Sequence, residues 1–265
     1  MKKTGRHHYL SFATSLARRA GAVIQKNFKT GMKKQWKPDD TPVTETDLSI
    51  NQMVIREVRK AYPDHSVLAE EGSDLKKGAQ YVWVCDPIDG TIPFSHGIPT
   101  CVFSLALVKD GVPVVAVVYD PFMDRLFTAE KGNGAKLNGK TIHVSPAKTL
   151  KNAVVGVRVW KFFQRFDFPD AMHNLDHQYD VIPINLMSVI YEGVLVACGE
   201  LAATFYQHVY AHDVAALKLI VEEAGGKVTD LFGNEQRYDG KIKGAVISNG
   251  WVHEKLVRMT RNALS

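Results

Sequence analysis

Apolar, β-branched stretches separated by tight turns constrain the fold of this chain most strongly. Thr100–Val108 and Val112–Tyr119 are long apolar stretches joined by Lys109-Asp110-Gly111, a sequence typical of a hairpin turn. Arg125–Ala129 predicts a third strand shortly afterwards. Strands that follow one another without intervening helices form antiparallel meanders, so the pattern predicts an α+β protein rather than a series of βαβ units.

Amphipathic segments on either side of this meander predict helices. They cover Tyr9–Phe28, Thr46–Tyr62, Ser188–Cys198, His212–Ala224 and Val252–Arg261, with Phe162–His177 as a helix or an irregular region. The other expected strands are Ser66–Ala69, Tyr81–Cys85, Thr141–Val144, Ala153–Val159, Val181–Asn185, Leu201–Tyr206 and Gly244–Ser248. Gly31–Pro42 is predicted as a loop.

A soft division is expected near residue 146. It separates an N-terminal half, residues 1–146, from a C-terminal half, residues 147–265. Because no linker rich in Gly, Ser or Pro lies there, we expect the halves to pack tightly as one unit.

The composition excludes several classes of protein. The chain has 265 residues, of which 45% are hydrophobic and 23% charged, as in globular proteins, and no apolar run reaches the ~20 residues that span a bilayer. Its three cysteines, Cys85, Cys101 and Cys198, are far apart, which argues against a disulfide scaffold or a zinc ribbon. The N-terminus lacks the uninterrupted apolar segment of a signal peptide, so we expect a cytoplasmic protein.

Acidic residues stand where buried elements are expected to end. Glu70-Glu71 follows the apolar run Val67-Leu68-Ala69, and Asp86 follows Val82-Trp83-Val84-Cys85, with Asp89 shortly after. Buried carboxylates are costly unless they are paired or bound to a cation. Two strands that both end in acids therefore predict a cation between them.

Two further acids lie at the expected starts of helices. Asp47 and Asp213 each begin an inward-facing apolar stripe. An aspartate in that position is usually a helix cap, and an adjacent pair of glutamates is usually solvated surface. Acids from four separate segments are a different case, because hard oxygen ligands suit Mg²⁺ or Mn²⁺ rather than zinc. No set of histidines or cysteines has the spacing of a competing metal site.

Gly90-Thr91, directly after Asp89, lies where a short helix could begin and run to Gly97. Free backbone N–H groups at a helix start bind phosphate, and glycine permits close approach to the backbone. Acids for metal ions beside such a segment indicate metal-assisted phosphoryl chemistry.

The motifs together resemble those of the inositol monophosphatase family. Asp86-Pro87-Ile88-Asp89-Gly90-Thr91 is similar to the family signature, and Ala69-Glu70-Glu71 to its double-glutamate motif. Thr44-Glu45-Thr46-Asp47 resembles the early threonine/aspartate motif, and His212-Asp213-Val214-Ala215-Ala216 the C-terminal motif, usually Trp-Asp-x-Ala. The motifs occur in order, so the resemblance extends over nearly the whole chain.

This resemblance implies a layered αβαβα sandwich and a Mg²⁺-dependent phosphomonoesterase that transfers phosphate directly to a metal-activated water. Two or three Mg²⁺ ions per subunit are implied, with Mn²⁺ as a substitute. The implied metal ligands are Glu70, Asp86, the Ile88 carbonyl, Asp89 and Asp213. The implied catalytic residues are Asp47, Glu71 and Thr91, and the implied substrate-binding residues are Gly90, Thr91, Ser188, Tyr206 and His212.

Departures from the family pattern lie on the side that would recognise the alcohol. The tryptophan before the C-terminal aspartate is replaced by His212, and Tyr206 stands where the family often has a glutamate that contacts an inositol hydroxyl. Met187-Ser188-Val189 replaces the usual Gly-Ser-Ala. The catalytic motifs are kept, so the resemblance predicts the chemistry more firmly than the substrate.

Inositol 1-phosphate, or a broad activity on small phosphorylated polyols and sugars, is the favoured substrate assignment. Histidinol phosphate, fructose 1,6-bisphosphate and 3′-phosphoadenosine phosphate are the alternatives within the superfamily. A role in RNA binding or an RNA-polymerase complex is the alternative from another class; it draws on the net charge of +5 and the cluster Lys33, Lys34, Trp36 and Lys37, but a nucleic-acid partner is not favoured. The resemblance also implies a homodimer, and no membrane partner is expected.

Overall fold

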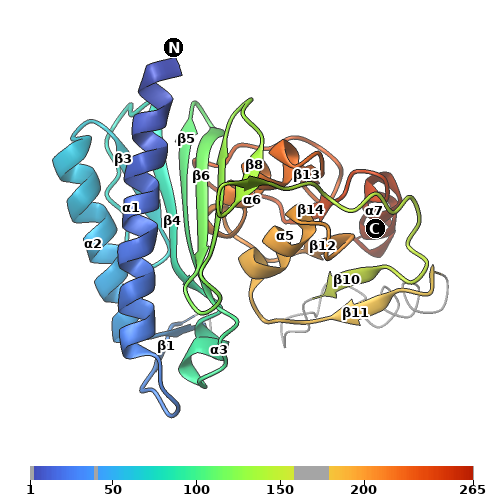
Figure 1. Ribbon diagram of the computed structural model, residues 1–265, viewed down its shortest axis with the longest axis horizontal. Coiled ribbons are helices and arrows are strands. Elements are labelled where there is room, and N and C mark those ends of the chain that lie inside the picture. The colour runs from blue at the N-terminus through green and yellow to red at the C-terminus, as the bar shows by residue number, and fades with distance from the viewer. Residues whose placement is uncertain (1–2, 39–40, 158–178, 265) are drawn as a thin grey trace.

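The computed structural model describes residues 3–38, 41–157 and 179–264. Helices and sheets alternate in five layers across the molecule (Figure 1). The helices are α1 (Lys3–Asn27), α2 (Glu45–Ala61), α3 (Thr91–Ser95), α5 (Val189–Ala197), α6 (Ala211–Glu223) and α7 (His253–Leu264). This arrangement confirms the predicted αβαβα sandwich.

The first sheet has seven strands in the order β3-β4-β5-β6-β7-β8-β9. They are β3 (Ser66–Ala69), β4 (Tyr81–Asp89), β5 (Val102–Lys109), β6 (Val112–Asp120), β7 (Arg125–Glu130), β8 (Ala135–Leu137) and β9 (Lys140–Thr141). From β5 onwards each strand is antiparallel to the one before it, which confirms the meander, whereas β3 pairs with β4 in parallel.

Successive residues along each strand of the first sheet point to opposite faces, as the period of two in a strand requires. Trp83, Phe103 and Leu105 pack with α1 and α2 on the outer face. Val84 and Val118 point the other way, into a core shared with α5 and α6. Because both faces are covered by helices, the strands are apolar throughout, which explains the long uninterrupted runs of the sequence.

The second sheet has five strands in the order β11-β10-β12-β14-β13. They are β10 (Val154–Val157), β11 (Ile182–Ile184), β12 (Ala203–Tyr206), β13 (Lys227–Thr229) and β14 (Ala245–Ser248). Tyr206 and Ile247 reach the core shared with α5 and α6, while Phe205 and Val246 pack with α7 on the outer side. Helices α5 and α6 therefore form the middle layer between the two sheets (Figure 1).

Several sequence predictions are wrong in detail. The predicted strand Thr141–Val144 is confined to β9, because the chain then leaves the sheet and Val144 N–H donates to the Ala224 carbonyl at the end of α6. The loop predicted over Gly31–Pro42 contains β1 (Gln35–Trp36), which pairs with β2 (Pro42–Val43). Strands β8 and β13 are too short to carry a periodic signal, and the predicted segment Phe162–His177 lies outside the described residues.

Among the described residues, no helix has both the length and the apolar character needed to cross a membrane. Cys85, Cys101 and Cys198 are free thiols, as expected from their spacing.

Candidate active site

A cavity that is partly open to solvent lies where β3 and β4 end and α3 and α6 begin. Its lining includes the chain entering α2 and the loop before α5 as well. The lining residues are Thr41, Pro42, Glu70, Asp86, Ile88, Asp89, Gly90, Thr91, Ile92, Asn185, Met187, Val189 and Asp213. Every metal ligand implied by the sequence is in this set.

The parallel pairing of β3 and β4 brings the first two acids together. Ala69 is opposite Cys85, so Glu70 and Asp86 follow on neighbouring strands at the same edge of the sheet. The pairing of β4 with β5 is irregular between Asp86 and Asp89, and this irregularity brings both aspartates to the cavity. On a regular strand, residues three positions apart, such as Asp86 and Asp89, would face opposite sides of the sheet.

Asp86, Asp89 and Asp213 form a compact group of buried carboxylates. One oxygen from each lies within 4.8 Å of the others. Burial, followed by the charges of Glu70, Asp89 and Asp213, raises the pKa of Asp86 well above its usual value. Asp86 Oδ1 is buried and has no hydrogen-bond partner among the described residues. An orphaned oxygen within a self-repelling set of acids fits a divalent cation, which would supply both the missing partner and the missing charge.

Asp47 is held in the first turn of α2 by a capping box with Thr44. The Thr44 backbone N–H donates to Asp47 Oδ2 at 2.9 Å, and the Asp47 backbone N–H donates to the Thr44 hydroxyl. Burial raises the pKa of Asp47 to about 6, although the bonds from Thr44 act in the opposite direction. Asp47 is therefore a helix cap, as an aspartate at this position usually is, but only one of its two carboxylate oxygens serves as the cap.

The other oxygen of Asp47, Oδ1, faces Thr91, which lines the cavity. The Thr91 hydroxyl lies 3.2 Å from Asp47 Oδ1 and 3.0 Å from the Ile88 carbonyl oxygen, so its single proton has two alternative acceptors. Asp47 is completely buried and does not line the cavity itself. It can act on a bound molecule through Thr91.

Gly90 allows the chain to turn from β4 into α3. Its φ is +87°, and a Cβ atom built on it would lie 2.7 Å from the Thr100 carbonyl oxygen and 3.2 Å from Ser188 Cβ. Only glycine meets both conditions without strain. The turn places Gly90 and Thr91 in the cavity wall, where the sequence analysis expects a phosphate group.

Lys37 supplies a cation at the edge of the acidic group. Its ammonium donates to Glu70 Oε1 at 2.7 Å and to Glu71 Oε1 at 2.9 Å. Burial lowers the pKa of Lys37, but the charge of Glu70 and the bonds to both glutamates outweigh this effect and raise it. Burial and the charge of Glu70 raise the pKa of Glu71 to about 7 despite the lysine. The sequence singled out Lys37 only as part of a basic cluster, because its contact with the glutamates depends on how the loop folds back.

Asp89 is held by the N-terminus of α5. The Val189 and Ile190 backbone N–H groups donate to its two oxygens at 3.2 Å and 2.7 Å, and the Ser188 hydroxyl also donates to it. Ser188 is buried and does not line the cavity. The structure therefore places Ser188 on a carboxylate of the acidic group, whereas the sequence assigned it to the substrate.

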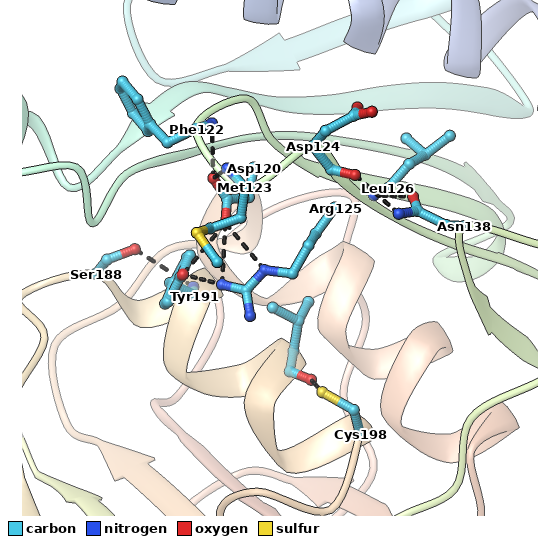
Figure 2. A network of polar contacts seen from close by, with 11 residues as sticks. Asp120, Phe122, Met123, Asp124, Arg125, Leu126, Asn138, Ser188, Tyr191 and Cys198 are labelled. Carbon is cyan, nitrogen blue, oxygen red and sulfur yellow. Dashed lines mark hydrogen bonds and ion pairs between the residues drawn. The ribbon is translucent and has the colours of Figure 1, made fainter. Parts of the chain in front are cut away.

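A polar network of Asp120, Arg125 and Tyr191 holds the N-terminal end of α5 (Figure 2). Asp120, which is completely buried, accepts bonds from the guanidinium of Arg125 at 2.9 and 3.1 Å. Arg125 also donates to the Tyr191 hydroxyl, which in turn lies 3.2 Å from Asp120 Oδ2. The Tyr191 backbone N–H donates to Ser188 Oγ at 3.3 Å. The network joins the turn between β6 and β7 to the residues that hold Asp89.

Tyr206 is buried and does not line the cavity. Its hydroxyl donates to Glu192 Oε2, while Glu192 Oε1 accepts the Leu186 backbone N–H at 2.7 Å. Burial and the charge of Glu192 raise the pKa of Tyr206 well above its usual value. Nothing in the sequence distinguishes Glu192 as a buried acid, because it lies inside an apolar helix without any neighbouring motif.

His212 lies beside the acidic group. Its ring stacks on Tyr210 with 5.3 Å between the ring centres, and Nε2 is 4.0 Å from Asp213 Oδ1. Ligand atoms of Glu70, Asp86 and His212 lie within 4.8 Å of one another. The sequence shows no ligand spacing for His212, because the three residues come together only in the fold.

The comparisons with known proteins agree with this geometry. A family model described as the inositol monophosphatase family matches residues 6–265. A fructose-1,6-bisphosphatase/inositol-1-monophosphatase of Thermotoga maritima is 32% identical over 96% of each chain. Inositol monophosphatase 1 of Solanum lycopersicum is 34% identical over 86% of each chain, and Nus factor SuhB of Escherichia coli is 33% identical over 86% of each.

Solved structures with the same fold include two enzymes that cover nearly the whole chain. An IMPase of Thermotoga maritima has a TM-score of 0.87 at 30% identity and covers 97% of this chain and 98% of its own. An inositol monophosphatase from Anabaena has a TM-score of 0.84 at 29% identity and covers 98% of this chain and 97% of its own.

Proposed function

This chain belongs to the inositol monophosphatase family and is a phosphoric monoester hydrolase, and we propose that its preferred substrate is inositol 1-phosphate or a similar small polyol or sugar phosphate. The observation that carries this proposal is the group Asp86, Asp89 and Asp213, with the orphaned Asp86 Oδ1, beside Gly90 and Thr91 in one cavity.

The donor set fits the divalent cation on which the family depends. Glu70, Asp86, Asp89, Asp213 and the Ile88 carbonyl are the residues that would hold Mg²⁺. When bound, the cation lowers the pKa of a coordinated water and neutralises charge on the phosphoryl oxygens.

The protein residues have separate roles in the proposed reaction. Gly90 and Thr91 hold the phosphoryl group against the start of α3. The Thr91 hydroxyl donates to Asp47, so that its own oxygen can accept a hydrogen bond from the attacking water and orient it. A pKa of about 6 leaves Asp47 mainly ionised above neutral pH, which keeps it an acceptor. Glu71, which follows Glu70 in the chain and has a pKa of about 7, is the second side chain beside the acidic group that accepts a proton from the attacking water.

The substrate assignment is tested by phosphate release from a panel of esters, with Mg²⁺ and without it. The panel holds myo-inositol 1-phosphate, histidinol phosphate, fructose 1,6-bisphosphate, 3′-phosphoadenosine phosphate and glycerol 2-phosphate. We expect Mg²⁺-dependent release, with the highest kcat/KM for myo-inositol 1-phosphate. A higher value for another ester would reassign the substrate, and no release from any of them would overturn the proposal.

The basic cluster of the sequence supports the enzyme rather than a nucleic-acid partner. Lys34 contacts Ser95 Oγ and His96 Nε2, and Lys37 contacts Glu70 and Glu71. Two of its three lysines are therefore engaged beside the cavity. We further propose two or three Mg²⁺ ions per subunit, a homodimer and a cytoplasmic location; sedimentation of the purified chain tests the dimer.

A further inference from the structure

We propose that His212 is a nitrogen ligand in a divalent metal site completed by Glu70 and Asp86, and that this site prefers a transition metal such as Mn²⁺ to Mg²⁺. The inference rests on the proposed function, because it takes these two acids as part of the catalytic metal centre. It adds a nitrogen ligand to the oxygen ligands of that centre, and it changes the preferred metal from Mg²⁺ to a transition metal.

The geometry places three possible ligands around one point. One atom each from Glu70, Asp86 and His212 lies within 4.8 Å of the other two, a spread compatible with metal–ligand distances of about 2.0–2.2 Å after small adjustments. A second observation points to a ligand at the same place: Asp86 Oδ1 is buried and has no partner among the described residues, and Asp86 lines the cavity.

The ring of His212 is held in place and remains available. Tyr210 stacks on it at an interplanar angle of 19°, and only 13% of the His212 side chain is exposed. Neither ring nitrogen makes a hydrogen bond within the described parts of the chain. A packed imidazole with free nitrogens costs little entropy to bring into coordination.

Lys37 neutralises Glu70 in the present structure. Its ammonium bonds Glu70 Oε1 at 2.7 Å, so a cation entering the site must take the other oxygen or displace the lysine. Within the described residues Lys37 bonds the two glutamates and neither His212 nor Asp86, so those two ligands exchange no lysine bond for the cation.

The donor set determines which metal is preferred. Asp86, Asp89 and Asp213 form a neighbouring group made only of oxygen atoms, which suits Mg²⁺. Glu70, Asp86 and His212 combine two carboxylates with an imidazole, a donor that Mg²⁺ accepts poorly and that first-row transition metals accept more readily. Asp86 belongs to both groups, so its two oxygens can join an oxygen-only site to a mixed one.

The experiment measures metal coordination in the full chain without substrate. Mn²⁺ is the probe, and pulsed electron paramagnetic resonance detects the ¹⁴N coupling of a coordinated imidazole. We expect this coupling in the unmodified protein, its loss in His212→Gln and in His212→Trp, and its retention in the control His143→Gln, whose side chain is exposed and outside the site. Thermal unfolding without metal confirms that each variant is folded.

Affinity supplies the second measurement. We expect the dissociation constant of Mn²⁺ to rise at least about tenfold in His212→Gln, and that of Mg²⁺ to change less than about twofold. Mn²⁺ binding without ¹⁴N coupling would overturn this inference and leave the proposed phosphatase intact. Failure of both Mn²⁺ and Mg²⁺ to bind would overturn the inference and the proposed function together.

Discussion

The backbone N–H of Ile190 donates a 2.7 Å hydrogen bond to a carboxylate oxygen of Asp89, although 101 residues separate them in the chain. Asp89 ends β4 in the first sheet, and Ile190 lies in the first turn of α5 in the middle layer. The N-terminus of α5 favours a negative charge, so it stabilises the ionised Asp89 carboxylate. The bond also means that the orientation of one acid in the cavity depends on how α5 is held.

Asp213→Asn tests the acidic group directly. Because one of three clustered carboxylates loses its charge, we expect phosphate release to fall at least about a hundredfold and the rise in Tm caused by Mg²⁺ to shrink to less than half. The metal-free variant should unfold at or above the Tm of the unmodified protein, since repulsion within the group decreases. Asp64→Asn, an exposed acid away from the cavity, is the control and should change neither quantity. Full turnover in Asp213→Asn would contradict the metal assignment.

Gly90→Ala combines two penalties at the turn into α3. The positive φ costs about 1–2 kcal/mol for any other residue, and the added Cβ meets the Thr100 carbonyl at 2.7 Å. We expect a loss of about 3 kcal/mol or more in the free energy of unfolding, together with most of the activity. Gly139→Ala has a similar φ, +80°, with no atom within 4 Å of the new Cβ, and should lose only the first penalty. Equal losses of stability in urea unfolding would show that the close approach is unimportant.

Arg125→Leu removes the cation that pairs with buried Asp120. A buried carboxylate without its cation is strongly destabilising, and we expect a loss of about 3 kcal/mol, the low end for a buried pair because the Arg125 side chain is 25% exposed, measured by urea unfolding. The comparison is Arg56→Leu, which breaks an exposed ion pair with Glu57 and should cost less than about 1 kcal/mol. If both variants unfold at the same urea concentration, the network of Figure 2 does not stabilise the fold.

His253 predicts a loss of stability in acid. It is completely buried between the Thr229 and Ser248 hydroxyls, and burial lowers its pKa from 6.5 to about 4. The unfolded chain therefore binds a proton that the folded chain refuses, so the stabilisation is complete above pH 6.5 and is lost as the pH falls towards 4. Between pH 8 and pH 5 the contribution of this residue falls by about 2 kcal/mol.

Urea unfolding of the unmodified protein and of His253→Gln at both pH values isolates that contribution. Other groups titrate in the same range, and they do so in both proteins. We expect the difference in unfolding free energy between the two proteins to narrow by about 2 kcal/mol at pH 5. A difference independent of pH would mean that His253 is not kept neutral by its surroundings.

Local patterns anticipated the main elements of the fold. The long helices α1, α2 and α6 and the strands β4 to β7 carry enough periodic residues to be found without the structure. Short strands such as β1 and β13 were missed because two or three residues show no period, and their pairing partners stabilise them.

The acids were also found by local reasoning, since a charged residue at the end of an apolar run contradicts its surroundings. Their partners were not. Lys37 bonds Glu70 and Ser188 bonds Asp89, in each case across a separation that no motif spans. Tyr206 was expected to face the alcohol, but its hydroxyl points into a buried bond instead.

Local sequence patterns identified the order of the main elements and the acids, because apolar periodicity and buried charge are properties of neighbouring residues, whereas the αβαβα layering was implied by the family resemblance. Which side chains meet follows from the packing of the elements. The bond between Asp89 and α5 and the grouping of His212 with Glu70 and Asp86 depend on packing α5 and α6 between two sheets. Packing of that kind is a property of the whole chain, so it cannot be inferred from any one segment.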